Sequence, residues 1–188
     1  MFGRRTRVLA ELMADLLPEP ARVLDVGTGD GTVVELVRKL RRGIEPTGID
    51  VLVRPSTPFQ VHAFDGLSIP FGDSTFDAAM LVDVLHHAED PERLLRECAR
   101  VAPVVVVKDH LADAPLAVPT LRFMDRVGNA RYGVALRYAY WRRAQWAAAA
   151  RQAGLREATF TMDVPLYPPP LSWVFGRDLH FVARFERI

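Results

Sequence analysis

Short apolar runs alternate with longer amphipathic stretches through most of the chain. The runs rich in β-branched and apolar residues predict buried strands over 22–26, 47–50, 60–64, 78–82, 104–107, 157–164 and 179–185. Between them, apolar residues at helical spacing predict helices over 32–41, 91–100 and 142–153. Because strands alternate with helices, we expect an α/β domain built on a mostly parallel sheet.

The first 20 residues carry an apolar stripe at helical spacing and predict an N-terminal amphipathic helix that packs on the sheet. Arginines before an apolar stretch resemble the start of a secretory signal, but Glu11 and Asp15 interrupt that stretch. No apolar run approaches the ~18 residues that a membrane span needs. We therefore expect a cytoplasmic protein with no membrane span.

The composition is that of one soluble domain, which we expect to cover residues 1–188. Hydrophobic residues make up 49% of the chain and charged residues 25%, the usual balance of a globular protein. The net charge of +1 gives no reason to expect a nucleic-acid partner. The only cysteine, Cys98, excludes an intramolecular disulfide, and we expect it to pack within a helix.

A glycine-rich turn follows the first predicted strand and opens the next helix. Gly27, Gly29 and Gly31 allow a tight turn and the close approach of a ligand to the backbone. The dinucleotide pattern G-x-G-x-x-G would place its third glycine at position 32, which is Thr32. This spacing disfavours a nicotinamide-dependent reductase.

The turn is also acidic, with Asp25 before it and Asp30 inside it. Phosphates usually bind the backbone N–H groups at such a helix start, and a carboxylate there would repel them. A cationic ligand would be tolerated. S-adenosylmethionine carries a sulfonium and an ammonium group and no phosphate, so this chemistry favours it over a dinucleotide.

Asp25-Val-Gly27-Thr-Gly29-Asp-Gly31 resembles motif I of the class I S-adenosylmethionine-dependent methyltransferases. Further segments follow in the order of that family, and they resemble its ribose-binding acid, its adenine-binding segment, its fourth strand and its helix D: 47–50, 64–66, 71–82 and 83–97. The match runs from about residue 22 to residue 109. The similar relatives are small bacterial methyltransferases of the quinone-biosynthesis type.

The resemblance implies a Rossmann-like seven-stranded sheet in the order 3-2-1-4-5-7-6, with strand 7 antiparallel and helices on both faces. The cofactor-binding residues that it implies are Asp25, Gly27, Thr28, Gly29, Gly31, Asp50, Val51, Phe64, Asp65, Gly66, Val82 and Asp83. Asp50 would accept hydrogen bonds from the ribose hydroxyls and Asp65 from the adenine amino group. Four of the acids lie at or just past predicted strand ends, so we expect them to converge on one crevice: Asp25, Asp50, Asp65 and Asp83.

The chain departs from the family pattern in two places. Only nine residues separate Asp50 from Gln60, and they include Pro55 and Pro58. This is too short and too broken for a crossover helix, so helix B should be short or absent. The Pro-Gly-Gly turn often found before the fifth strand is also missing.

The long segment over 111–141, between the fifth strand and the next helix, predicts a substrate lid with a short helix over 119–127. Its aromatic residues are the candidates for substrate binding: Phe123, Tyr132, Tyr138 and Tyr140. The alternative is that these aromatics pack on the sheet as ordinary core.

Candidate general bases follow the fourth and fifth strands. His110 is the first choice, with His87 and Asp109 beside it, because all of them fall near the predicted lid. For each histidine alone, a solvated or capping role is the simpler alternative. A Mg²⁺ site on Asp83 and Asp109 lacks an apparent third ligand, so we expect no metal site.

These residues favour a methyltransferase that acts on an O, N or C nucleophile of a small molecule. The N-P-P-aromatic pattern of enzymes that methylate nucleic-acid amino groups is missing after the fourth strand, where Asp83-Val-Leu-His86 stands. RNA methylation is therefore an alternative that we do not favour. A non-catalytic S-adenosylmethionine-binding protein, or an inactive partner subunit, is the other. The sequence leaves the acceptor and the oligomeric state open.

Overall fold

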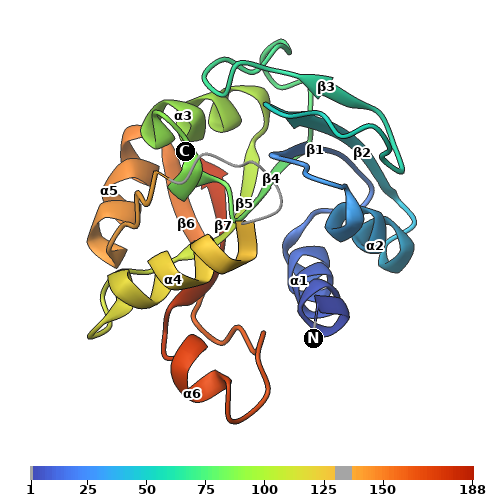
Figure 1. Ribbon diagram of the computed structural model, residues 1–188. Coiled ribbons are helices and arrows are strands. Elements are labelled where there is room, and N and C mark those ends of the chain that lie inside the picture. Colours follow the sequence, from blue (N-terminus) through green and yellow to red (C-terminus); the bar gives the residue numbers. More distant parts are fainter. Residues whose placement is uncertain (1, 130–136) are drawn as a thin grey trace.

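A seven-stranded sheet forms the centre of the molecule in the computed structural model, which describes residues 2–129 and 137–188 (Figure 1). The strands are β1 (Ala21–Val26), β2 (Ile44–Asp50), β3 (Val61–Ala63), β4 (Ala78–Val82), β5 (Val104–His110), β6 (Leu155–Thr161) and β7 (His180–Arg187). Their order is β3-β2-β1-β4-β5-β7-β6, as predicted. β7 runs antiparallel to β5 and β6, and the other pairs are parallel.

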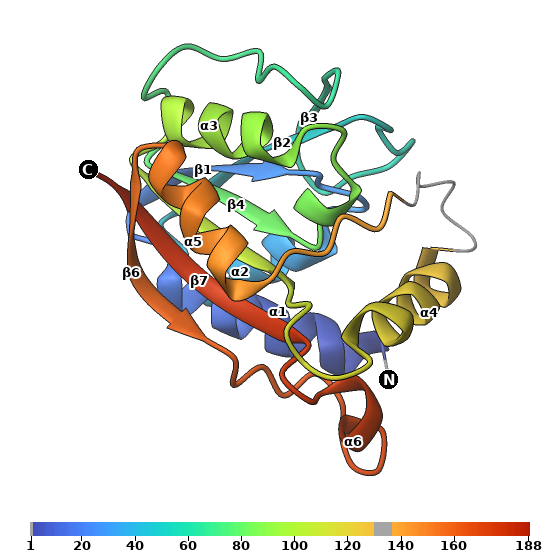
Figure 2. The ribbon, with the colours of Figure 1, turned by 90° about the vertical axis from the view of Figure 1, so that its left-hand side faces the viewer.

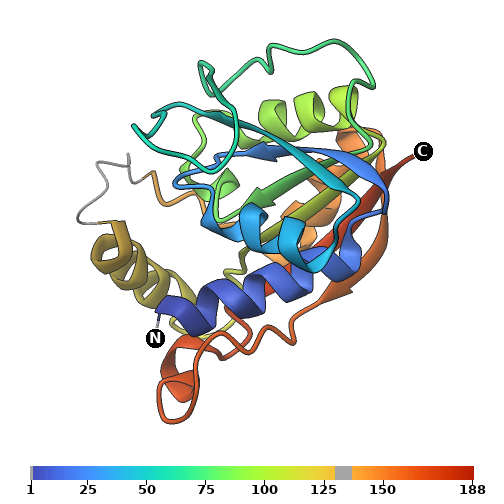
Figure 3. The same ribbon diagram turned by 90° about the vertical axis from the view of Figure 1, so that its right-hand side faces the viewer.

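Helices cover both faces of the sheet (Figures 2 and 3). The described helices are α1 (Phe2–Leu16), α2 (Thr32–Leu40), the 3₁₀ helix η1 (Leu85–His87), α3 (Pro91–Val101), α4 (Ala117–Asn129), α5 (Arg143–Gln152) and α6 (Ser172–Phe175). α1 and α2 pack on one face, and α3 and α5 pack on the other. None of these helices is long and apolar enough to cross a membrane.

Alternate side chains of each strand belong to the hydrophobic cores on opposite faces of the sheet. In β5, Val104 and Val106 belong to the cluster under α1 and α2, whereas Val105 and Val107 belong to the cluster under α3 and α5. Alternate residues of a strand point to opposite faces, so a strand covered on both sides must be apolar throughout. This explains the uninterrupted run of valines.

β5 is three residues longer than the sequence pattern predicts. Lys108, Asp109 and His110 stay in the strand, and all three are buried. The antiparallel partner β7 continues the pairing until His110 faces His180. The polar end of β5 therefore lies inside the molecule, where its side chains need polar partners.

The connection over 51–60 contains no helix, as its length and its two prolines predict. α3 begins where the sequence predicts, because Asp90 caps it by accepting a hydrogen bond from the Arg93 N–H at 2.8 Å and Pro91 occupies its first turn.

α4 lies beyond the carboxyl ends of the parallel strands, apart from the two helical layers (Figure 2). Its inner side packs on Leu179 and Tyr140 through Ala117 and Leu121. The predicted short helix in the 111–141 segment thus exists, and it is somewhat longer than expected.

The turn between β1 and α2 approaches its neighbours closely. Gly27 has a φ of +70°, and a Cβ at that position would lie 2.6 Å from Cγ2 of Val84. Gly29 has a similar φ of +60°, but a Cβ there would meet nothing within 4 Å. A side chain at either glycine would strain the backbone, but only a side chain at Gly27 would also overlap with a neighbour.

We predict that Gly27→Ala destabilises the protein more than Gly29→Ala. Both substitutions place a side chain in the left-handed region, at about 1–2 kcal/mol. Only Gly27→Ala adds the overlap with Val84, which costs about 1–3 kcal/mol more. Urea unfolding of both variants measures the difference in free energy of unfolding. Equal losses would show that close packing of the turn on Val84 does not matter.

Candidate functional site

Hydrogen bonds fix the glycine turn to the end of β2. The N–H groups of Gly27 and Thr28 donate to the carbonyl of Ile49 at 2.8 and 3.2 Å. The N–H of Gly29 donates to Oδ2 of Asp50 at 2.7 Å, and Oδ1 of Asp50 accepts from the Leu52 N–H at 2.8 Å. The carboxylate of Asp50 therefore lies directly beside the turn, as the sequence predicts.

Asp25 is a buried carboxyl at the carboxyl end of β1, with an exposed fraction of 5%. Burial, together with the nearby charge of Asp50, raises the pKa of Asp25 to about 8. The Thr28 hydroxyl donates to the carbonyl of Asp25 at 2.8 Å, which ties the strand end to the turn. Asp25 is consequently protonated at neutral pH until a positive charge comes close.

Asp65 and the segment after β2 lie side by side. Oδ1 of Asp65 accepts from the N–H groups of Leu67 and Ser68 at 2.8 and 2.7 Å, and these bonds hold the pKa of Asp65 below its usual value. A Cβ on Gly66 would lie 3.2 Å from Val51. Val51 itself is 65% exposed, an apolar side chain at the mouth of the site.

The residues that the resemblance implies for cofactor binding lie at or just past the carboxyl ends of β1, β2, β3 and β4. They are Asp25, Gly27, Thr28, Gly29, Gly31, Asp50, Val51, Phe64, Asp65, Gly66, Val82 and Asp83. The topology therefore brings them to one edge of the sheet. Asp83 differs from the other residues of this set because its carboxylate forms ion pairs with basic side chains of the protein.

Asp83 forms ion pairs with Lys108 of β5 and Arg5 of α1. Burial alone would raise the pKa of Asp83, but Lys108 and Arg5 hold it well below its usual range. Lys108 has an exposed fraction of 0%, and burial lowers its pKa against the opposing effect of Asp83. A fully buried lysine is rare without such a partner.

His86 and Asp109 form a buried pair next to this ion pair. Nδ1 of His86 lies 2.6 Å from Oδ1 of Asp109, and both side chains are almost fully buried. Burial would lower the pKa of His86, but the charge of Asp109 raises it to about 10. Asp109 also accepts from the N–H groups of Leu85 and His110 at 3.1 and 2.8 Å. Asp109 therefore orients His86 and is not free to act as a base.

His110 has a defined tautomer. Nε2 of His180 lies 2.9 Å from the Phe175 carbonyl, so this nitrogen carries a hydrogen and donates it. Nδ1 of His180 is then an acceptor, and it lies 3.1 Å from Nδ1 of His110. His110 thus donates from Nδ1 and keeps a lone pair on Nε2. Burial, with the charge of Lys108, holds the pKa of His110 well below its usual value.

Asp125 of α4 lies next to His86 and His110. Its Oδ2 lies 3.4 Å from Nε2 of His86, and its Oδ1 lies 3.9 Å from Nε2 of His110. The Tyr140 hydroxyl donates to Oδ2 of Asp125. Although burial opposes it, His86 lowers the pKa of Asp125, so this carboxyl is ionised at neutral pH. We call His86, Asp109, His110, Asp125, Tyr140 and His180 the histidine–aspartate cluster.

His87 lies against the cluster, with its ring centroid 4.0 Å from that of His86. Burial lowers its pKa, and the charge of His86 lowers it further. Nδ1 of His87 has no hydrogen-bond partner among the described residues. His87 is therefore a neutral imidazole at the edge of the cluster.

The four aromatic candidates for substrate binding have different surroundings. Tyr140 belongs to the histidine–aspartate cluster, and Tyr138 lies under the guanidinium of Arg122. Phe123 is 58% exposed and stacks on Phe175 of α6. Tyr132 lies outside the described residues.

Sequence reasoning did not identify Arg5, Lys108, Asp125 and His180. Lys108 could have been identified from the sequence, because a charged residue directly after four valines of a buried strand needs a partner of opposite charge. The other three come from α1, α4 and β7, and only the tertiary fold brings them to this edge.

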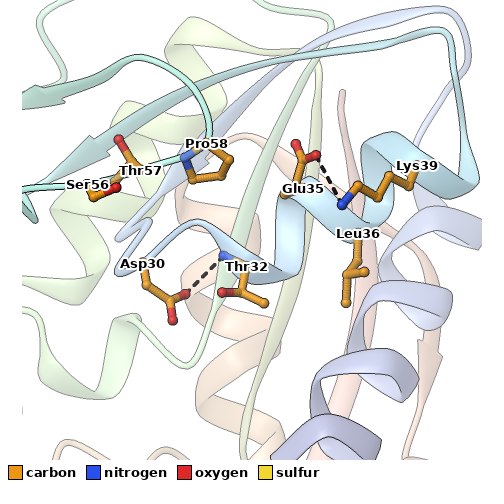
Figure 4. Close-up of a pocket in the computed structure, with 8 residues that line it drawn as sticks. All are labelled: Asp30, Thr32, Glu35, Leu36, Lys39, Ser56, Thr57 and Pro58. Atoms are coloured by element: carbon orange, nitrogen blue, oxygen red, sulfur yellow. Dashed lines mark hydrogen bonds and ion pairs between the residues drawn. The ribbon is translucent and has the colours of Figure 1, made fainter.

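A separate hollow of about 420 Å³ lies between α2 and the loop before β3 (Figure 4). It is lined by Asp30, Thr32, Glu35, Leu36, Lys39, Ser56, Thr57 and Pro58. None of these residues belongs to the predicted cofactor set or to the histidine–aspartate cluster.

Solved structures share the fold. An S-adenosylmethionine-dependent methyltransferase from Mesorhizobium loti aligns with 94% of this chain and 96% of its own, with a TM-score of 0.70 and 18% identity. The [4+2]-cyclase SpnF aligns with 96% of this chain and 80% of its own, with a TM-score of 0.70 and 19% identity. At such identities the likeness establishes the fold alone.

Curated relatives match in sequence over part of their length. Demethylmenaquinone methyltransferase of Thermotoga maritima is 34% identical over 104 residues, covering 52% of this chain and 44% of the relative. Ubiquinone biosynthesis O-methyltransferase of Hahella chejuensis is 33% identical over 93 residues, covering 43% and 38%. The chain thus spans less than half the length of these relatives. A family model described as a methyltransferase domain matches residues 1–158, and the chain belongs to this family of class I methyltransferases.

Proposed function

We propose that the protein is an S-adenosylmethionine-dependent methyltransferase that acts on a nucleophilic O, N or C atom of a small molecule. The observation that carries this proposal is the acidic glycine turn, hydrogen-bonded to Asp50 at the carboxyl edge of the sheet. Ligands of open α/β sheets bind at this edge, where the strand order reverses between β1 and β4.

The residues at this edge suit the chemistry of S-adenosylmethionine. Around Gly29 there is open space, so a ligand can approach the backbone of the turn. Asp25 is a buried carboxyl whose raised pKa reflects desolvation with no compensating cation among the described residues. A ligand that brings positive charge would supply that cation.

Asp50 and Asp65 keep hydrogen-bonding capacity for a nucleoside. Each oxygen of Asp50 accepts one backbone N–H, and a carboxylate oxygen has two lone pairs. One further bond per oxygen therefore remains for two neighbouring ribose hydroxyls. Oδ1 of Asp65 is occupied by two N–H groups, which leaves Oδ2 for an amino group. Val51 offers an apolar surface next to Gly66 for a flat ring.

The bound S-adenosylmethionine would supply an electrophilic methyl group on its sulfonium. The protein's own part is to align the acceptor with that methyl group and to exclude water, which can lower the barrier by about 7–11 kcal/mol. Nε2 of His110 is the lone pair available to take a proton from an O–H or N–H acceptor. Asp109 and His180 position the two histidine rings.

The acceptor that we propose is an aromatic compound of the quinone-precursor class. This follows the names of the relatives, which methylate demethylmenaquinone or take part in ubiquinone biosynthesis. α4 and the residues around Tyr138 and Tyr140 would form the acceptor side, since they lie next to the carboxyl edge of the sheet. We propose that residues 111–141 act as the lid over this side.

We predict that Asp50→Ala weakens the binding of S-adenosylmethionine and S-adenosylhomocysteine by at least ~10-fold, because two charge-assisted hydrogen bonds are lost. Isothermal titration calorimetry measures both affinities. The matched control is Asp73→Ala, which removes an exposed carboxylate that pairs with Arg100. Wild-type affinity in Asp50→Ala, or no binding to the wild-type protein, would contradict the proposed site.

We predict that S-adenosylmethionine binding releases a proton near neutral pH. Asp25 is protonated below its pKa of about 8, and a positive ligand nearby lowers that pKa. The affinity should therefore rise with pH between about 6 and 8. Calorimetry in buffers of different ionisation enthalpy counts the protons. Asp25→Asn, which cannot titrate, should bind without this release, and equal release in both proteins would exclude Asp25 as the source.

We predict that His110→Gln lowers the rate of methyl transfer by about 10²–10⁴-fold, the usual contribution of a general base. Transfer of labelled methyl groups to a panel of phenols and hydroquinones provides the assay. The affinity for S-adenosylmethionine should not change, and His62→Gln, a histidine of β3 outside the cluster, should keep full turnover. Unchanged turnover in His110→Gln would contradict the role of this residue.

A further inference from the structure

We propose that His86, His110 and Asp125 bind a divalent transition-metal ion of the Zn²⁺ class at the carboxyl edge of the sheet. Their potential ligand atoms, one from each residue, lie within 4.8 Å of one another, and all three residues are buried. They come from η1, β5 and α4, so the fold assembles the site from distant parts of the chain.

His110 offers a lone pair that faces negative charge. The hydrogen-bond chain through His180 to the Phe175 carbonyl places the hydrogen of His110 on Nδ1. Nε2 therefore carries no hydrogen, yet it lies 3.9 Å from Oδ1 of Asp125 and 3.6 Å from Oδ1 of Asp83. The lone pair and the carboxylate oxygens are all hydrogen-bond acceptors, so they cannot bond to one another directly. A cation between His110 and Asp125 would satisfy this lone pair.

His86 has the orientation of a metal-binding histidine. Its Nδ1 is held by Asp109 at 2.6 Å, and Asp109 is itself fixed by the N–H groups of Leu85 and His110. This is the carboxylate–histidine arrangement that usually supports a metal ligand. Nε2 of His86 is buried and has no hydrogen-bond partner of normal geometry among the described residues. It points toward Asp125, 3.4 Å from Oδ2. The ion would replace the proton that Nε2 of His86 carries at neutral pH, and that proton would go to solvent.

The spacings suit an ion of this class. Zinc lies about 2.0–2.2 Å from imidazole nitrogens and carboxylate oxygens. Tetrahedral ligands at such distances are about 3.3–3.6 Å apart, which matches the 3.4 Å between Nε2 of His86 and Oδ2 of Asp125. Nε2 of His110 lies 3.9 Å from the other oxygen of Asp125, Oδ1, so ion binding needs a rotation of this carboxylate that brings one oxygen close to both histidines.

A second group of possible ligands, Asp83, Asp109 and His110, is less suited to an ion. Asp83 already binds Lys108 and Arg5, and both oxygens of Asp109 accept hydrogen bonds. The sequence shows no third ligand for a Mg²⁺ ion on Asp83 and Asp109 and predicts no metal site. Two imidazoles and one carboxylate instead favour a transition ion over Mg²⁺.

Three protein ligands leave a coordination position open, as in catalytic zinc sites. If the proposed function holds, that position would take the hydroxyl of the acceptor, which ionises more readily on the metal and gives its proton to solvent. This inference deepens the proposed function: it narrows the acceptor to hydroxyl compounds. The lone pair of His110 would then coordinate the ion. The metal, in place of His110, would activate the oxygen of the acceptor.

The test is metal binding by the full chain, which needs neither acceptor nor turnover. Protein treated with EDTA is titrated with Zn²⁺ against a chromophoric chelator, and with Co²⁺ followed by its visible absorption. We expect one equivalent of each ion and the absorption of a low-coordinate Co²⁺ site. His110→Gln and Asp125→Asn should each weaken Zn²⁺ binding by at least ~100-fold, more than the loss of an outer-shell partner.

The matched control is His62→Gln, which removes a histidine outside the cluster and should leave Zn²⁺ affinity unchanged. Asp125→Asn keeps the shape of the side chain, so its folding can be compared with that of the wild-type protein. The affinity for S-adenosylmethionine, measured in the same samples, distinguishes failure of the metal site from failure of the proposed function. No stoichiometric binding, or equal affinity in the wild-type protein and the two site variants, would overturn the metal site.

Discussion

The site depends on the contact between the glycine turn and the end of β2. Three successive N–H groups of the turn, from Gly27 to Gly29, donate to Ile49 and Asp50. This contact requires the absence of a side chain at Gly48, where a Cβ would lie 2.5 Å from the Thr28 hydroxyl. The carboxylate of Asp50 is thereby fixed beside the turn before any ligand binds. Such preorganisation lowers the entropic cost of binding.

The second determinant is the burial of charge at the end of β5. Lys108, Asp109 and His110 are covered because β7 pairs with the strand to its last residue. Each then needs a partner: Lys108 pairs with Asp83 after β4, Asp109 with His86 of η1, and His110 with His180 of β7. Asp125 of α4 in turn lies 3.4 Å from His86. A charge that loses its partner in such a place is costly, by about 3–5 kcal/mol. The cluster therefore links the cofactor edge of the sheet to α4.

Much of the fold could be predicted because its determinants are local. The valine run, the glycine turn and the prolines of the 51–60 connection each specify their own segment, and the resemblance supplied the order of the strands. The cofactor half of the site follows in the same way, since Asp25, Asp50 and Asp65 stand at strand ends that the sequence marks.

The histidine–aspartate cluster could be predicted only in part, because its contacts are distant in sequence. Arg5 and Asp83 are 78 residues apart, and His110 and His180 are 70 residues apart. Nothing in the pattern of α4 distinguishes Asp125 from a solvated residue. The pattern also predicts the end of β5 three residues too early, because polar residues usually end a strand. The packing of α4 determines the position of Asp125, and the length of β7 determines where β5 ends.

The measurement that tests the central claim most directly is a crystal structure of the protein with S-adenosylhomocysteine. We expect the ribose hydroxyls on the carboxylate of Asp50, the adenine beside Val51 and Asp65, and the amino-acid part near the turn and Asp25. Electron density for the ligand elsewhere, for example in the hollow between α2 and the loop before β3, would contradict the account.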